Sequence, residues 1–220
     1  MNARLGHYPC DHGGGLQSKD VIRTLIFDLG NVIVPFDFKI GYQRLAELCG
    51  YPAAEIPAKI RSTGLVHPFE TGQVSAQYFV HELSAVLGLK ATYSEFCELW
   101  SSVFLPETLI PEPFLGGLSE RYRLLLLSNT NPIHFSMVKA RYPLLAHFDD
   151  YVLSYEVRSA KPEPKIYRQA LERAECPPEE CFFTDDLLVN VEAAREHGID
   201  AVQFLSAEQI ESELQARGVV

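Results

Sequence analysis

Short apolar runs alternate with segments of helical periodicity along most of this chain, and this alternation limits the folds open to it. The runs are rich in branched and aromatic residues, which predicts buried strands. Strands that alternate with helices favour a parallel, doubly wound sheet, so we expect an α/β fold. The runs lie at residues 21–29, 123–127, 151–154, 181–184 and 201–204.

The segments between the later runs have the spacing of amphipathic helices. Their apolar residues recur at three- and four-residue intervals, and Gly198 follows the last of them as a stop signal. The predicted helices of this part cover residues 113–121, 132–142, 163–173 and 190–197.

Between the first and second runs the pattern is helical throughout. Ile40, Leu45 and Leu48 recur at helical spacing before Gly50, and further amphipathic helices are expected at 75–87 and 92–104. No strand is predicted here. The sequence therefore predicts an all-helical insert, within ordinary domain sizes. The expected division is a catalytic core of residues 21–37 and 107–220 with an insert of residues 38–106.

The first twenty residues lack apolar periodicity and contain three consecutive glycines at 13–15, so a mobile N-terminal tail at 1–20 is predicted. His7, Cys10 and His12 are conceivable metal ligands. A fourth ligand is missing nearby, so a tail without a metal is the favoured interpretation.

Composition narrows the function classes. The net charge is 19 − 29 = −10, which argues against a general nucleic-acid binder, because such binding rests on Lys and Arg neutralising phosphates. An anionic substrate would need a local positive site. The five cysteines are odd in number and form no CxxC motif, which favours free thiols in a reducing compartment. With neither a membrane-length apolar stretch nor a secretory signal, we expect a cytoplasmic protein without a membrane partner.

Polar residues stand where the predicted strands end. Because ligands bind outside the carboxyl ends of a doubly wound sheet, these residues are expected to converge at one edge. They are Asp28 at the end of the first run, Ser128, Asn129 and Thr130 after the second, Lys161 beyond the third, and Asp185 and Asp186 after the fourth.

Each of these residues also has a structural explanation. Asp28 could cap a turn, Ser128 could cap the next helix, and Lys161 could be a solvated loop lysine. The pair Asp185 and Asp186 could open a helix, where the helix dipole favours carboxylates. The joint placement of all of them at strand ends favours a common site.

The chemistry of this set suits phosphoryl transfer. The Asp28 carboxylate can attack phosphorus when a divalent cation screens the repulsion, and Mg²⁺ takes such hard oxygen ligands from Asp28, Asp185 and Asp186. Ser128 and the backbone N–H groups that open the next helix can hold phosphate oxygens. Lys161 can neutralise charge on Asp28 and on the phosphoryl group.

The motifs FDLGNVIV (27–34), LLLLSNTN (124–131), KPEPKIY (161–167) and FFTDDLLVNVEAA (182–194) resemble, in order, those of the haloacid dehalogenase-like superfamily. The resemblance implies a Rossmann-like core with a helical cap, Asp28 as nucleophile, and Ser128 and Lys161 as phosphate and charge stabilisers. It implies Mg²⁺ as cofactor, held by Asp28, the Gly30 carbonyl and Asp185 or Asp186. Asn129, Gly30 and Asn31 are expected to join the phosphate site.

One position departs from that pattern. Phosphatases of the superfamily usually carry a second Asp two residues after the nucleophile, as general acid, and this chain has Gly30 there. The run DLGNV resembles a branch that includes bacterial phosphatases of α-glucose-1-phosphate type, which suggests that Gly30 is compatible with activity. His134, Asp37 and solvent are the candidate proton donors, and a packing or capping role for His134 is slightly favoured.

The leading hypothesis is a Mg²⁺-dependent phosphatase acting on a small phosphate ester such as a sugar phosphate. The alternatives are a phosphomutase and a catalytically weak protein that binds a phosphate ligand. The cap residues Phe69, Glu70, Tyr78 and Trp100 are possible pocket residues, although such spacing more often marks a cap core. Monomer and homodimer both remain open.

Overall fold

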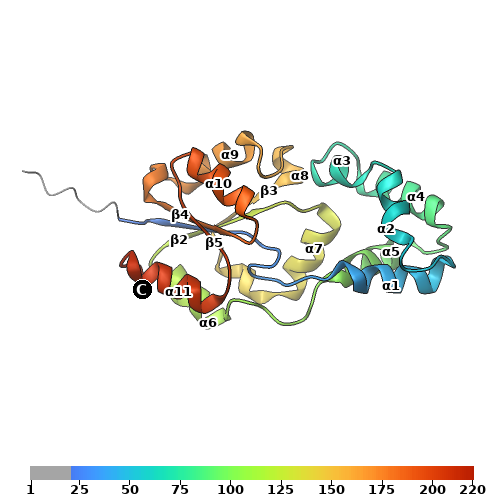
Figure 1. The fold of residues 1–220 in the computed structure, drawn as a ribbon, viewed down its shortest axis with the longest axis horizontal. Helices are drawn as coiled ribbons and strands as arrows, with labels where there is room; N and C mark the ends of the chain where they lie inside the picture. Colours follow the sequence, from blue (N-terminus) through green and yellow to red (C-terminus); the bar gives the residue numbers. More distant parts are fainter. Residues whose placement is uncertain (1–20) are drawn as a thin grey trace, which may run out of the picture.

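The computed structural model describes residues 21–220. Its centre is a five-stranded sheet in which all neighbouring strands are parallel, in the order β3-β2-β1-β4-β5 (Figure 1). This sheet, with helices on both sides, confirms the predicted α/β fold. The strands are β1 (Thr24–Phe27), β2 (Arg123–Ser128), β3 (Asp150–Leu153), β4 (Cys181–Asp185) and β5 (Asp200–Gln203).

Helices bury both faces of the sheet (Figure 1). Leu25 and Phe27 of β1 join one apolar cluster with α6, α7 and α11, whereas Ile26 joins another with α9 and α10. Side chains alternate along a strand, so a continuous apolar run is what a sheet covered on both faces requires. The core helices are α6 (Glu112–Ser119), α7 (Pro132–Arg141), α8 (Ser154–Val157), α9 (Pro164–Ala174), α10 (Leu188–Glu196) and α11 (Ala207–Ala216), with 3₁₀ turns at Pro143–His147 and Pro178–Glu180.

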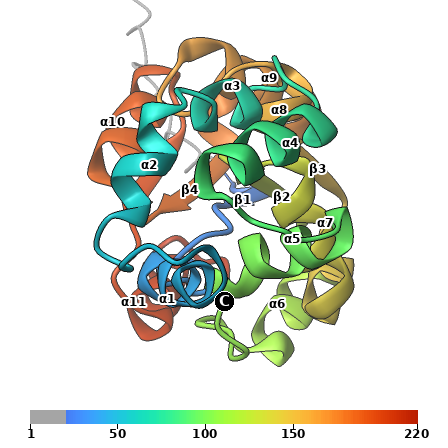
Figure 2. The same cartoon turned by 90° about the vertical axis from the view of Figure 1, so that its right-hand side faces the viewer.

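The remaining helices lie beyond the carboxyl ends of the strands, in front of the sheet in Figure 2. They share a third apolar cluster, which includes Phe69, Phe79 and Phe96 and reaches Ile133 of α7. We propose that residues 38–106 act as the cap expected from the sequence. Its helices are α1 (Phe38–Cys49), α2 (Ile56–Ser62), α3 (Val66–Glu70), α4 (Ala76–Leu87) and α5 (Tyr93–Trp100), followed by a 3₁₀ turn at Ser101–Val103.

Capping residues set the ends of the long cap helices. The Asp37 side chain accepts a hydrogen bond from the Lys39 backbone N–H at 2.8 Å and begins α1, and Gly50 ends it with a φ of 70°. Thr92 and Glu95 form a reciprocal capping box at the start of α5. The ends of these long cap helices therefore follow from local capping signals in the sequence.

Some boundaries differ from the prediction. The first strand spans four residues, because the chain turns after Asp28 and Asn31 has a φ of 53°. The helix expected over 92–104 ends at Trp100 and tightens into the 3₁₀ turn. Helices α2, α3, α8 and α11 were not predicted. In α11 the buried residues are only Ile210 and Leu214, so its apolar stripe is narrow.

Cys49, Cys97, Cys176 and Cys181 are free thiols. Cys10, with His7, His12 and the predicted tail, lies outside the described residues. Within residues 21–220, every helix is too short or too polar to cross a lipid bilayer.

Candidate active site

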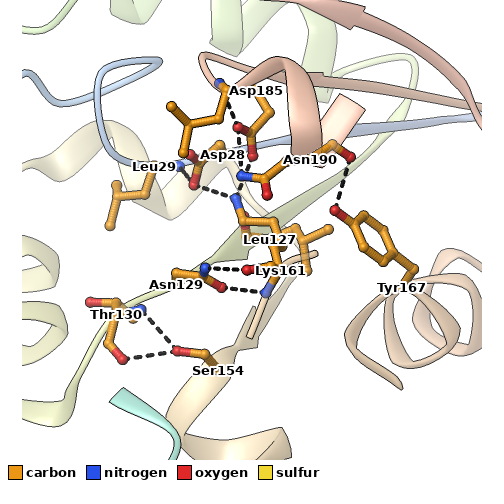
Figure 3. A network of polar contacts seen from close by, with 11 residues as sticks. Asp28, Leu29, Leu127, Asn129, Thr130, Ser154, Lys161, Tyr167, Asp185 and Asn190 are labelled. Carbon is orange, nitrogen blue, oxygen red and sulfur yellow. Dashed lines mark hydrogen bonds and ion pairs between the residues drawn. The ribbon is translucent and has the colours of Figure 1, made fainter. Parts of the chain in front are cut away.

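Lys161 lies at the centre of the polar groups at the carboxyl edge of the sheet (Figure 3). Its Nζ atom is 2.8 Å from Asp28 Oδ1 and 2.6 Å from Asp185 Oδ2, and it donates to the Leu127 carbonyl at 2.8 Å. The Lys161 side chain is only 1% exposed. The ends of β1, β2 and β4 thus meet around one ammonium group, and the alternative of a solvated loop lysine is wrong.

Burial and ion pairing together determine the protonation of Asp28 and Lys161. Burial raises the pKa of Asp28 to about 7, although Lys161 acts to lower it. For Lys161, burial lowers the pKa, but the Asp28 and Asp185 carboxylates outweigh burial and leave the pKa raised. Lys161 therefore remains a cation, which is the local positive charge that an acidic protein needs to hold an anion.

Three carboxylates form a candidate metal centre. One oxygen from each of Asp28, Asp185 and Asp186 lies within 4.8 Å of the others. Asp185 is held on both oxygens, by Lys161 on Oδ2 and by the Leu187 N–H and the Asn190 amide on Oδ1, each at 2.9 Å. Asp28 Oδ1 takes Lys161 and the Leu29 N–H, whereas its Oδ2 receives no donor from the residues that the structure describes. The set offers hard oxygen atoms of the kind that Mg²⁺ prefers.

Ser128 and Asn129 follow the central strand β2 but differ in their contacts. Ser128 lines a small cavity at this edge, together with Gly30. The Asn129 side chain instead accepts from the Lys161 N–H at 2.7 Å and donates to the Lys161 carbonyl at 2.9 Å (Figure 3). Asn129 was predicted to bind phosphate, but its amide group is committed to fixing the backbone of Lys161.

Comparison with known proteins identifies the family of the chain. A family model described as haloacid dehalogenase-like hydrolase matches residues 22–198. The D-ribitol-5-phosphate phosphatase of Bacteroides thetaiotaomicron is 30% identical over 83% of this chain and 92% of that protein. The phosphorylated carbohydrates phosphatase of Thermotoga maritima is 26% identical over 82% of this chain and 84% of that protein. The chain belongs to the haloacid dehalogenase-like hydrolase family.

A solved structure extends the similarity to three dimensions. The family enzyme from Bacteroides thetaiotaomicron in complex with magnesium and inorganic phosphate matches with a TM-score of 0.75 and 30% identity, over 84% of this chain and 95% of that one. The family resemblance drawn from the four motifs is therefore confirmed, and so is the prediction that this protein is a hydrolase.

The position of the missing carboxylate in this hydrolase is occupied by an aromatic ring. A Cβ atom built on Gly30 would lie 2.7 Å from Cε1 of Phe36. Phe36 in turn packs edge-on against Phe38 and Phe104. The Phe36 ring thus occupies the space that the side chain of the usual general acid would need. Any side chain at residue 30 must displace this ring.

His134 and Asp37 were the side chains proposed to replace that acid. The His134 Nε2 atom donates to the Trp100 carbonyl at 3.0 Å, since a carbonyl can only accept, and Nδ1 is 3.1 Å from the Asn131 amide nitrogen. Burial lowers the pKa of His134 to about 4. Asp37 is exposed and caps α1. The geometry therefore favours the packing interpretation for His134 and leaves neither residue in position to donate a proton.

Two further residues of the site were missed by the sequence reasoning. Asn190 holds Asp185, and its own carbonyl accepts from the Tyr167 hydroxyl at 2.9 Å (Figure 3). The Ser154 hydroxyl accepts from the Thr130 N–H at 2.9 Å and contacts the Glu70 carbonyl at 2.6 Å. Asn190 stands inside the recognised motif, so its spacing from Asp185 was a usable signal, whereas nothing in the sequence pairs Ser154 with the cap.

Two adjoining cavities lie between this edge and the cap. The smaller, of about 70 Å³, is lined by Gly30, Phe36 and Ser128 among others. The larger, of about 260 Å³, is lined mainly by apolar cap residues, with Arg61 of α2 as its cation. Both are bordered by Phe38, Glu70, Val103 and His134. Of the cap residues considered from the sequence, Glu70 and Trp100 line a cavity, Phe69 is buried in the cap core and Tyr78 is exposed.

Proposed function

We propose that this hydrolase is a Mg²⁺-dependent phosphatase that releases phosphate from a small sugar or polyol phosphate through an aspartyl-phosphate on Asp28. The observation that carries the proposal is the contact of the buried Lys161 ammonium with Asp28 and Asp185, beside a third carboxylate. Such a site combines a nucleophile, a fixed cation and a set of oxygen ligands.

The carboxylates differ in how free they are to hold the metal. Asp28 Oδ2 and the half-buried Asp186 carboxylate are the ligands we favour, with the Gly30 carbonyl as a third. Asp185 is saturated by Lys161, Leu187 and Asn190, so we assign it the role of holding the ammonium group in place. When bound, Mg²⁺ would screen the repulsion between the attacking carboxylate and the phosphate.

The phosphate would occupy the edge between Asp28 and the loop after β2. The Ser128 hydroxyl borders the cavity there, and Lys161 supplies the positive charge that stabilises the transferring group. Asn31 offers its side-chain NH2 group, because its backbone N–H donates to the Val34 carbonyl at 3.0 Å and its side-chain oxygen accepts from the Phe36 N–H at 3.2 Å. Attack by Asp28 breaks the bond between phosphorus and the leaving oxygen, and water then cleaves the aspartyl-phosphate.

The relatives support a proposal for the substrate class. Two of them are named for phosphorylated carbohydrates and for D-ribitol 5-phosphate, and both are covered over most of their length. The roughly 260 Å³ cavity beside the phosphate edge has room for a leaving group of a few carbon atoms. We therefore place the physiological substrate among sugar and polyol phosphates.

The test is a phosphate-release assay over a panel of sugar and polyol phosphates, with and without Mg²⁺. The wild-type protein should hydrolyse at least one of them in a Mg²⁺-dependent manner, and Asp28→Asn should abolish that activity, since the amide cannot act as the nucleophile. Equal phosphate release by wild type and Asp28→Asn would refute the proposal. Asp149→Asn serves as the matched control, because Asp149 is exposed and directly precedes β3, at the opposite end of the parallel strands from the three carboxylates.

A further inference from the structure

The proposed reaction leaves one proton without a donor. An alkoxide is a poor leaving group, and a positioned acid contributes on the order of 10²–10⁴ in rate to such a step. Gly30 has no side chain, the His134 ring nitrogens are both bonded, and Asp37 caps α1 at the surface. This leaves solvent, or another group that borders the carboxyl edge of the sheet, as the donor.

Glu70 is the acidic residue on that border. It is the last residue of α3 and lines the small cavity together with Gly30, Ser128 and Thr130. The other residues around this cavity carry apolar, amide, hydroxyl or imidazole side chains, so Glu70 is its single carboxyl group among the residues that the structure describes. It also borders the larger cavity, where the leaving group would lie.

The backbone of Glu70 is fastened to the loop that carries the phosphate site. Its carbonyl accepts a hydrogen bond from the Ser154 hydroxyl at 2.6 Å, and the same hydroxyl accepts from the Thr130 N–H at 2.9 Å. Two residues further on, Gly72 has a φ of 64°, and a Cβ there would lie 2.0 Å from the Tyr155 carbonyl oxygen. This close approach between the cap and α8 is possible only for glycine, and it fixes Glu70 against the catalytic edge.

The state of the carboxyl group suits a proton donor. Burial raises the pKa of Glu70 and outweighs His67 on the same helix, which acts to lower it. Its carboxyl oxygens form no hydrogen bond or ion pair within residues 21–220, so the group is free to meet a substrate.

We propose that Glu70, a residue of the cap, is the catalytic acid of this hydrolase. This rests on the proposed function. As the Asp28 carboxylate bonds to phosphorus, the bond from phosphorus to the leaving oxygen breaks, and the Glu70 proton passes to that oxygen to give the free alcohol. The Glu70 carboxylate then takes a proton from the water that attacks the aspartyl-phosphate, which yields inorganic phosphate, regenerates Asp28 and restores the acid.

The test compares leaving groups in Glu70→Gln, with Glu47→Gln, an exposed residue of α1, as the matched control. For the best alkyl phosphate of the panel, kcat/KM should fall about 10²–10³-fold, because the alcohol needs the proton. For p-nitrophenyl phosphate, whose leaving group needs none, kcat/KM should change less than about threefold. Rapid mixing of the variant with this ester should give a burst of one nitrophenol per site, since water attack on the aspartyl-phosphate is slowed.

Two results would overturn the assignment: an equal fall in kcat/KM for both esters, which indicates a structural or binding role, or no change for either. Ser154→Ala tests the positioning of Glu70 without altering its carboxyl group and should reproduce the selective loss on the alkyl ester in milder form. Asp28→Asn should abolish turnover of both esters, so failure of the underlying phosphatase proposal is distinguishable from failure of the role given to Glu70.

Discussion

At the carboxyl edge of the sheet, Lys161 contacts three oxygen atoms within 2.8 Å, and Asp185 is bonded on both oxygens. Under the cap, Arg61 and Glu70 border mainly apolar cavities and form no ion pair with any residue that the structure describes. The paired groups are already arranged before a ligand arrives, whereas the unpaired ones gain a partner only from the substrate. We infer that the core holds the nucleophile and the fixed cation, whereas the cap contributes the proposed acid and the contacts to the leaving group.

The strongest way to break this comparison is to remove the central cation. Lys161→Met should reduce phosphate release by at least about 10²–10³-fold, because the developing charge loses its stabiliser. It should also lower the free energy of unfolding by about 3–5 kcal/mol, since Asp28 and Asp185 are left buried beside each other. Denaturant unfolding with and without Mg²⁺ measures the second effect, and Mg²⁺ should recover part of the loss.

Lys165→Met is the matched control, because Lys165 is exposed on α9. It should leave both activity and unfolding unchanged. If Lys161→Met were as stable as this control in the absence of metal, the ion pairs of Lys161 with Asp28 and Asp185 would not stabilise the fold as described.

A smaller effect is expected where the core meets the cap. Gly30→Ala places a methyl group against Phe36 and should lower the free energy of unfolding by about 1–3 kcal/mol through overpacking. Phe36→Leu in the same chain should relieve part of that cost. Gly117→Ala is the matched control, because a Cβ there meets nothing within 4 Å. Equal stability of the two alanine variants, measured by chemical denaturation, would contradict the close packing of Phe36 on Gly30.

The third prediction concerns the buried imidazole behind the cavities. The pKa of His134 is about 4 in the folded protein, below the ordinary value of 6.5, so the unfolded chain binds more protons between these values. The stabilisation from His134 is therefore complete above pH 6.5 and is lost as the pH falls towards 4, by up to about 3 kcal/mol.

Unfolding titrations between pH 7 and 4 check this dependence. His134→Gln should flatten the slope, whereas His81→Gln, an exposed substitution on α4, should keep it. A slope that is identical in all three proteins would show that His134 does not titrate as its burial requires.

The core and its polar edge could be predicted from the sequence because their signals are local. The central strands β1, β2 and β4 each contain a continuous apolar run, and Asp28 and Asp185 stand where two of these runs end. Lys161 was harder to place, since it lies in a loop, and only the order of the motifs tied it to Asp28.

The rest depends on contacts between distant segments. Three tertiary contacts leave no periodic pattern in the sequence. Phe36 covers Gly30, Ser154 contacts Glu70, and Asn129 binds the Lys161 backbone. His134 illustrates the limit: its position after the motif allowed either a proton donor or a packed ring, and only the two bonds on its ring separate these roles.

Phe36 also stands where the chain leaves the core, and it forms an isolated bridge with Phe104, where the chain returns. The two chain segments that connect the core with the helical part are thus joined at one point. This point lies beside Gly30, whose carbonyl is a proposed metal ligand. A swing of the helical part about this pivot would withdraw the Glu70 carboxyl from the carboxyl edge of the sheet. Admission of solvent would then coincide with loss of the carboxylate that activates water, so the incoming water would meet the phosphorylated aspartate without its base.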